Sequence, residues 1–407
     1  MAATALDIPI ELVELIIDQA AALSDRETLR TLALTSRNYV ARCQKHLFHT
    51  IDLGDRCIPG SEYYRRLYNI LAIRPSLCGY VRELRMHDTY VWDKESNWRW
   101  LVDEESICDL LDFLPALTTF ALTFNAAVPS WMDFKPSIRN AIIQLARRPL
   151  LHTFALANVK NFPASLLVTL VTISRLELSN VQVQDLSVTT PLEVVLGIAS
   201  ISTPGVRELT LRAPSAGLLL VLRTILSASV HPTLTTLRVL MLDAADTLAT
   251  LELWSLMHWG ANSITEFEWR PAVRPRTPAI RPPAPIDICI FRRLAALHFI
   301  VNFHSESQPV FAALIPLLQQ ISSGSYFHTL KIECTFLRPA ELIACQRDWG
   351  ALDEALSQSA FDGLKEVVFY ARQRGPSRGE LVKTILDEQL LLARARGVKI
   401  LVDASLR

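Results

Sequence analysis

One short pattern of apolar and variable positions recurs along most of the chain. An apolar residue is followed by two variable residues, a second apolar residue, one variable residue and a third apolar residue. Ten copies occur, and their central residues advance from Leu84 to Val367 at about 31 residues per copy. Each copy predicts a short strand with one apolar face, and residues 398–406 are a candidate for one more. The ten copies are Val81-Leu84-Met86, Leu117-Phe120-Leu122, Leu151-Phe154-Leu156, Ile173-Leu176-Leu178, Val206-Leu209-Leu211, Leu234-Leu237-Val239, Ile264-Phe267-Trp269, Leu294-Leu297-Phe299, Phe327-Leu330-Ile332 and Leu364-Val367-Phe369.

Segments with helical periodicity lie between these strands. Their apolar residues recur every three or four positions, which is typical of amphipathic helices. Strand and helix alternating at this period predict an α/β fold with a parallel sheet and right-handed crossovers. Helices on one side only would curve the sheet into a horseshoe-shaped solenoid, whereas a doubly wound sheet with helices on both sides is the alternative. The helical segments are 62–73, 104–114, 137–148, 192–200, 216–228, 311–321 and 379–395.

The variable positions within the strands are mostly polar and mixed in charge, whereas the positions that alternate with them are apolar. Because the side chains of a strand point to opposite faces in turn, we expect one covered face and one open, concave face. The open face is a natural site for a protein partner, although a merely solvated surface would have the same composition. Five arginines on this face are candidate partner-binding residues, for instance for a phosphorylated segment, although glutamates lie between them: Arg85, Arg175, Arg212, Arg238 and Arg270.

Residues 6–53 have a different pattern, which predicts three short helices. A proline and a glutamate suit the first turn of the first helix, where a missing N–H group costs nothing and a carboxylate complements the helix dipole. Ser24 and Glu27 have the spacing of a capping box at the start of a second helix. Thr35 or Ser36 would cap a third helix. We therefore expect a compact helical module ahead of the repeats.

This module resembles the F-box. The family pattern begins with a Leu-Pro or Ile-Pro pair and continues with Glu-Leu in an apolar helix. A leucine-rich helix follows, and then a Ser-Arg or Cys-Arg pair before an aromatic residue. The matching residues here are Ile8-Pro9, Glu11-Leu12, Ile16-Ile17, Leu29, Leu32, Leu34, Ser36-Arg37 and Tyr39.

The resemblance implies that the module docks a Skp-type adaptor and, through it, the cullin of a cullin–RING (SCF-type) ubiquitin ligase. An ordinary three-helix cap on the following domain is the alternative. The repeats resemble an irregular leucine-rich-repeat domain, which is joined to many F-boxes and is common in fungal families. They lack the regular turn asparagine of that family, which Asn125, Asn158 and Asn180 match loosely. By resemblance, the adaptor-binding residues are Ile8, Pro9, Leu12, Ile16, Leu32 and Leu34.

Two insertions interrupt the repeats. Residues 89–105 contain Trp92, Trp98 and Trp100 among charged residues. Clustered tryptophans can anchor a protein partner, or they can fold back over the end of the sheet. Residues 270–285 hold six prolines, a density that no helix or central strand tolerates, so we expect an extended loop there.

Composition narrows the class of protein. The chain has 407 residues and half of them are apolar, so it can bury a large core. It has 41 basic and 41 acidic residues and therefore lacks the basic excess of a nucleic-acid or membrane binder. Seven scattered cysteines without a CxxC motif predict reduced thiols rather than disulfides or a zinc site. There is no secretory signal or apolar membrane-spanning run, so we expect a cytoplasmic and/or nuclear protein.

Motifs of catalysis and cofactor binding are missing: the sequence has no HExxH, no GxSxG and no phosphate-binding GxxxxGK[ST]. We therefore predict no catalytic residues, no cofactor, no metal and no enzymatic activity. The predicted organisation is an F-box at 1–50 and a leucine-rich-repeat-like solenoid at 51–407, with insertions at 89–105 and 270–285. The predicted function is substrate recognition in a ubiquitin ligase for a target protein that the sequence does not identify. The alternative is a repeat scaffold without a role in ubiquitination.

Overall fold

The computed structural model divides the chain into two compact units, Met1–Phe162 and Pro163–Arg407. The division between the units falls within the predicted repeats, after Phe162. It does not test the predicted boundary after residue 50, which stays a prediction. The residues that the structure describes are 9–23, 25–54, 60–87, 100–125, 128–184, 205–228, 233–242, 246–271, 288–302, 311, 314–321, 326–335, 346–358, 361–372, 384 and 386–403.

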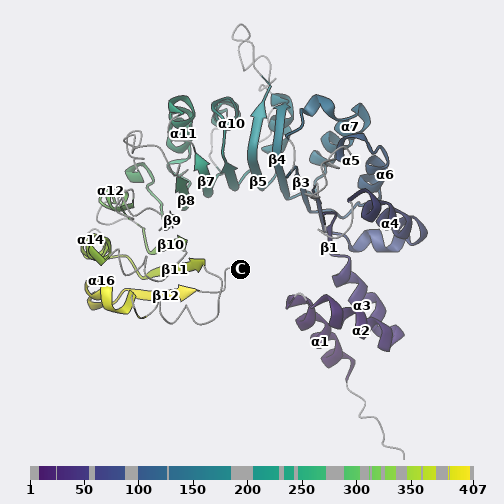
Figure 1. Ribbon diagram of the computed structural model, residues 1–407, viewed down its shortest axis with the longest axis horizontal. Helices are drawn as coiled ribbons and strands as arrows, with labels where there is room; N and C mark the ends of the chain where they lie inside the picture. Colours follow the sequence, from purple (N-terminus) through teal and green to yellow (C-terminus); the bar gives the residue numbers. More distant parts are fainter. Residues whose placement is uncertain are drawn as a thin grey trace, which may run out of the picture. The chain divides into compact units, whose positions relative to one another are not determined.

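The first unit contains three helices followed by a parallel sheet of four strands in sequential order (Figure 1). Helices α4 to α7 lie on one side of these strands (Figure 1). The short first strand, β1, was not among those predicted. In chain order the elements are α1 (Ile10–Ala22), α2 (Arg26–Thr35), α3 (Arg37–Leu47), β1 (Thr50–Asp52), α4 (Gly60–Ile73), η1 (Pro75–Tyr80), β2 (Glu83–His87), α5 (Trp100–Asp103), α6 (Ser106–Phe113), β3 (Thr119–Thr123), η3 (Trp131–Asp133), α7 (Pro136–Ala146) and β4 (Thr153–Phe162).

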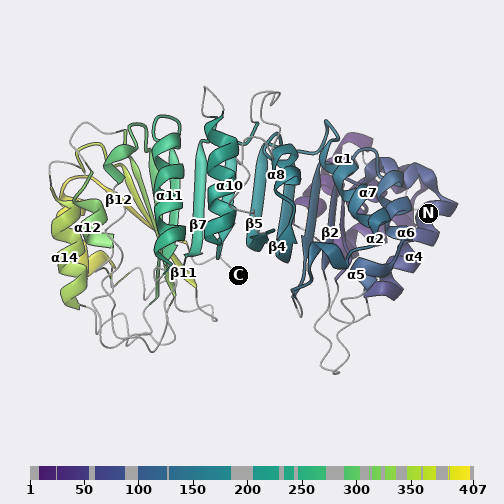
Figure 2. The same cartoon turned by 90° about the horizontal axis from the view of Figure 1, so that it is seen from above.

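The second unit continues the alternation with eight parallel strands, again in sequential order. Figures 1 and 2 show α10, α11, α12 and α14 on the same face of this sheet. The elements are α8 (Ala164–Leu170), β5 (Arg175–Val183), β6 (Glu208–Arg212), α10 (Ala216–Ser227), β7 (Thr236–Leu242), α11 (Thr247–Gly260), β8 (Glu266–Pro271), η5 (Ile288–Ile290), β9 (Ala296–Asn302), α12 (Leu314–Leu318), β10 (Thr329–Thr335), α14 (Gln346–Leu356), β11 (Glu366–Arg372), α16 (Leu391–Ala395) and β12 (Lys399–Asp403).

The ten predicted strands are all present as β2 to β11, and residues 399–403 form the additional strand β12. The predicted α/β class with a parallel sheet is therefore confirmed. Sequential strand order with helices on one face is compatible with a solenoid, whereas a doubly wound sheet would reverse its strand order and carry helices on both faces. The horseshoe curvature stays a prediction. The predicted helix at 192–200 lies outside the described residues.

The apolar strand positions form the core, as their alternation predicts. Leu84 of β2 pairs in register with Phe120 of β3, and Phe120 pairs with Phe154 of β4. Each of these three side chains is at most 1% exposed. In the second unit Leu330 and Val367 are equally buried in neighbouring strands. One face of each sheet is therefore closed by its helices over nearly its whole length.

Caps define the starts of α2 and α3. The carboxylate of Asp25 accepts a hydrogen bond from the backbone N–H of Thr28, so Asp25 is the N-cap of α2. The capping box predicted one residue earlier, at Ser24, is therefore placed wrongly, and Ser24 itself lies outside the described residues. The hydroxyl of Ser36 accepts from the N–H of Asn38 at the start of α3, which confirms one of the two predicted caps.

A residue with left-handed backbone recurs at the same position in four consecutive repeats, within β4, β5 and β7 and directly after β6. Asn158, Asn180, Ala213 and Met241, each five residues after the first residue of its strand, have φ between 46° and 61°. Asparagine tolerates this conformation better than other residues with side chains, because its amide bonds to nearby backbone, and the amide of Asn158 donates to the carbonyl of Phe124. Two of the three loosely matching asparagines, Asn158 and Asn180, therefore occupy a left-handed position, whereas Asn125 does not. The next two repeats have Ala213 and Met241 at this position, which suit it less well.

We expect Met241→Asn to stabilise the protein by about 0.5–1 kcal/mol, because it replaces a strained left-handed methionine with a residue that adopts this conformation easily. Met241 is exposed and lies at an irregularity in the register between β7 and β8, so the exchange disturbs little packing. Urea denaturation measures the change. Met241→Val should instead destabilise, because a β-branched residue is least suited to positive φ; equal effects of both variants would contradict this account.

Candidate functional site

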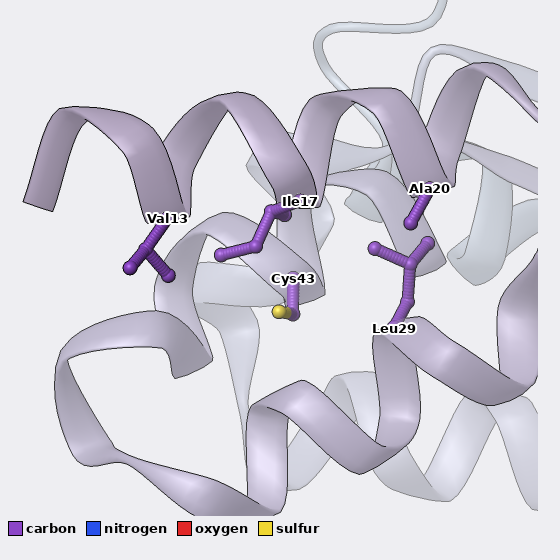
Figure 3. Close-up of a cluster of buried hydrophobic side chains, with 5 residues drawn as sticks. All are labelled: Val13, Ile17, Ala20, Leu29 and Cys43. Carbon is purple, nitrogen blue, oxygen red and sulfur yellow. The ribbon is translucent and has the colours of Figure 1, made fainter. Parts of the chain in front are cut away.

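The three helices of the module share a small core of their own. Val13, Ile17 and Ala20 of α1 point towards Leu29 of α2 and Cys43 of α3 (Figure 3), and all five side chains are buried. The α1 residues recur at three- and four-residue intervals, which places them on one side of the helix. This core orients α1 against the other two helices. Partly buried residues packed around it are Ala21, Leu32, Ala33, Tyr39 and Leu47.

Helix α1 carries more apolar side chains than this core covers. At 100° per residue, Leu12 and Ile16 lie beside the buried stripe, and Leu15 lies further around the helix. All three are at least half exposed. Leu34, near the end of α2, is 88% exposed. Several large apolar side chains left exposed on one small module make it a candidate for binding a protein. We use the name apolar surface of the module for its exposed large apolar side chains, which are Ile10, Leu12, Leu15, Ile16, Leu23 and Leu34.

The predicted adaptor-binding residues fall into three groups. Pro9, Leu12, Ile16 and Leu34 are exposed and free to meet a partner. Leu32 packs against the core of the module, so its side chain is only partly accessible. Ile8 lies outside the described residues. The sequence interpretation did not include Ile10, Leu15 and Leu23, although a helical wheel of α1 shows an apolar arc too wide for one small core.

Ion pairs hold the opposite flank of α1 against α3. The guanidinium of Arg42 lies 2.6 Å from carboxylate oxygens of both Glu14 and Asp18, and Nε2 of His46 lies 2.8 Å from Asp18. The hydrogen bond from Arg42, followed by that from His46, holds the pKa of Asp18 far below its usual range. Glu14 and Asp18 are one turn apart on α1, so their ion pairs with α3 fix the rotation of α1 about its axis. Leu12 and Ile16 are therefore held facing outwards.

The predicted partner-binding arginines are mostly used in ion pairs with neighbouring glutamates. In the first unit Arg85 lies 2.7 Å from Glu83. In the second unit Arg175 contacts Glu177 at 2.7 Å and Glu208 at 3.7 Å. Arg212 is exposed at the end of β6. These contacts do not gather the arginines around one point, so a pocket for a phosphorylated segment stays a prediction.

A row of charged side chains crosses four adjacent strands of the second unit. Arg238 lies 3.4 Å from Glu268, and Glu268 lies 3.3 Å from Nδ1 of His298. Nε2 of His298 lies 4.0 Å from Glu333. Burial on its own would raise the pKa of Glu268. The hydrogen bond with His298 and the positive charges of His298, Arg238 and Arg270 outweigh burial, so the pKa is lowered below its usual value.

The strand face that carries this row is not uniformly open. Glu333 is 3% exposed, and Val368 in the next strand is 9% exposed. The predicted open face is thus partly closed over β10 and β11, whereas Arg85 in the first unit is exposed as expected. A partner would find accessible charge at some positions of this face and buried structural charge at others.

The tryptophan-rich insertion is described only from Trp100 onwards. Trp100 begins α5, is 6% exposed and packs on Tyr64 with ring centroids 6.0 Å apart. It is a core residue, which agrees with the alternative that these aromatics fold back over the structure. Trp92 and Trp98 lie outside the described residues, as do residues 272–285 of the proline-rich insertion.

No known family model matches this sequence, and no curated protein is significantly similar to it. Among the described residues, no three His, Cys, Asp or Glu side chains gather closely enough to hold a metal ion. No helix in the described part of the chain has the length and apolarity needed to cross a membrane. The apolar surface of the module is the strongest candidate for a functional site, because its large apolar side chains are exposed on a small module.

Proposed function

We propose that this chain is the substrate-recognition subunit of a cullin–RING ubiquitin ligase. The helical module would dock a Skp-type adaptor, and the repeats, of leucine-rich type, would bind the target protein. The observation that carries the proposal is the apolar surface of the module, with Leu12 and Ile16 at its centre on α1. Its position on a module whose residues match the F-box pattern supports an adaptor as the partner.

Such a chain needs no catalytic residues. It would act by holding a lysine of the target protein close to the charged conjugating enzyme, which raises the effective concentration of the two reactants. The chemistry would take place on other subunits of the ligase. The proposal is therefore consistent with an interaction protein that works in the cytoplasm and/or nucleus.

The rival function is a repeat scaffold in which the helices only cap the sheet. A cap buries its apolar side chains against the repeats that it covers. Leu12, Leu15, Ile16 and Leu34 point away from the core of the module instead and remain exposed. The rival is supported by the backbone contacts that tie the end of the module to β2, where the carbonyl of His49 accepts from Arg82 and Glu83.

Mixing the purified chain with a purified Skp-type adaptor tests the proposal. We expect a stable complex in size-exclusion chromatography and a measurable affinity in calorimetry. A variant that lacks residues 1–48 but keeps β1 should remain folded and lose the complex. Aggregation of this variant together with no binding by the full chain would favour the cap.

A further inference from the structure

Strand β12 lies at an edge of the sheet of the second unit. It pairs with β11 on one side, and no strand among the described residues pairs with its other side. The N–H of Lys399 donates to the carbonyl of Lys365, so the backbone groups of Lys399 face β11. Because these groups alternate between the two sides of a strand, those of Ile400 and Val402 face the unpaired side. An unpaired row of this kind is a template for another strand.

Apolar side chains at this edge are also incompletely covered. Ile400 and Val402 occupy the register positions of Val367 and Phe369 in β11, which are at most 1% exposed. Ile400 and Val402 themselves remain partly exposed. In α16, which precedes β12, Leu391 and Leu392 are more than half exposed. The edge therefore offers both hydrogen-bonding groups and apolar area to a partner.

The sequence of β12, Lys-Ile-Leu-Val-Asp, is complementary to itself in one antiparallel register. If two copies pair about Leu401, Ile400 lies opposite Val402 of the other copy, and Lys399 lies opposite Asp403. The outward backbone groups of Ile400 and Val402 then bond to each other, as in a hydrogen-bonded antiparallel pair. Opposite charges and apolar pairs directly across two strands are both stabilising. A parallel in-register pairing would instead place like charges together.

We propose that two copies of this chain form a symmetric dimer through antiparallel pairing of their β12 strands. The twofold axis would be perpendicular to the sheet and pass midway between the Leu401 residues of the two copies, so the same surface is used on both copies. This symmetry keeps the helices of both copies on the same face of the joined sheet. The two α16 helices then adjoin each other, where Leu391 and Leu392 lose exposure. This dimer is independent of the proposed adaptor and of the module that would bind it.

Analytical ultracentrifugation of the full chain at roughly 1 to 100 µM tests the dimer. We expect a reversible monomer–dimer equilibrium in the wild type. Lys399→Glu places a carboxylate opposite Asp403 twice in the dimer and should raise the dissociation constant about tenfold. The double variant Lys399→Glu/Asp403→Lys restores opposite charges and should return the constant to near its original value. Lys399 is exposed, so Lys399→Glu should not impair folding. Circular dichroism checks the fold of both variants.

Lys365→Glu is the matched control, because Lys365 is an exposed lysine beside β11 and not on the unpaired edge. It makes the same change of charge and should leave the equilibrium as it is. A wild type that stays monomeric, or that forms open-ended oligomers, would overturn the proposal. A dimer that Lys399→Glu does not weaken, or that the double variant does not restore, would overturn this register.

Discussion

Replacing Leu12 and Ile16 together by alanine is expected to weaken binding of a Skp-type adaptor about 100-fold. Each side chain is about half exposed in this chain, and an adaptor surface that covered both would remove them from water. Losing two such contacts costs about 3 kcal/mol of binding free energy. Calorimetry with the purified adaptor measures the change. Because alanine favours the helix, α1 should keep its structure.

Helix α11 offers a matched control for this experiment. Leu248 and Leu251 are 65% and 62% exposed on their helix, so Leu248→Ala/Leu251→Ala removes similar apolar area elsewhere on the chain. This variant should bind the adaptor as the wild type does. An unchanged affinity after Leu12→Ala/Ile16→Ala would refute the assignment of the docking surface. If both double variants weakened binding equally, the effect would be general and not a property of the module.

A second comparison separates docking from folding of the module. Val13→Ala/Ile17→Ala lies on the same helix but in the core, so it should weaken binding by destabilising the module. Hydrogen exchange of α1 to α3 should then rise markedly. Leu12→Ala/Ile16→Ala should leave exchange almost unchanged while it removes the affinity. The two variants thus distinguish a contact with the adaptor from support of the helices.

The repeats could be located from the sequence because each strand is short, apolar on one face and regularly spaced. All ten predicted strands are found, since a buried strand between helices has few alternatives for its apolar residues. Strand β1 was missed because it has only three residues, Thr50–Asp52, and includes an aspartate. Its place in the sheet depends on pairing with β2, a tertiary interaction that no local pattern contains.

Exposure of the candidate site was only partly predictable. The family pattern named Leu12 and Leu34, which are exposed, but also Leu32, which packs on the core of the module. The pattern specifies residue types along the chain. It does not specify which of these residues stay exposed once the three helices pack together. The burial of Glu333 was not predictable for a similar reason. Strand alternation places it on the face expected to be open, and only the tertiary structure shows that it is covered.

The start of α16 depends on a carboxylate from another helix. Leu390 occupies the N-cap position and provides no capping side chain. Instead, the two carboxylate oxygens of Asp353 in α14 accept hydrogen bonds from the N–H groups of Leu392 and Ala393, both at 2.9 Å. Asp353 is 5% exposed. A helix of five residues has little stability of its own, so this contact holds α16 in place.

Asp353→Ala should therefore destabilise the second unit by about 3 kcal/mol, because it leaves two N–H groups without their acceptor and removes a favourable charge from the helix start. Urea denaturation measures the loss, and hydrogen exchange should rise first in α16 and β12, which follow the lost contact. Glu354→Ala is the control, since Glu354 is an exposed acid on the same helix, and it should change stability by less than about 0.5 kcal/mol. Asp353→Asn keeps one acceptor and should fall between the two. Equal stability of Asp353→Ala and Glu354→Ala would mean that packing alone, and not this carboxylate, positions α16.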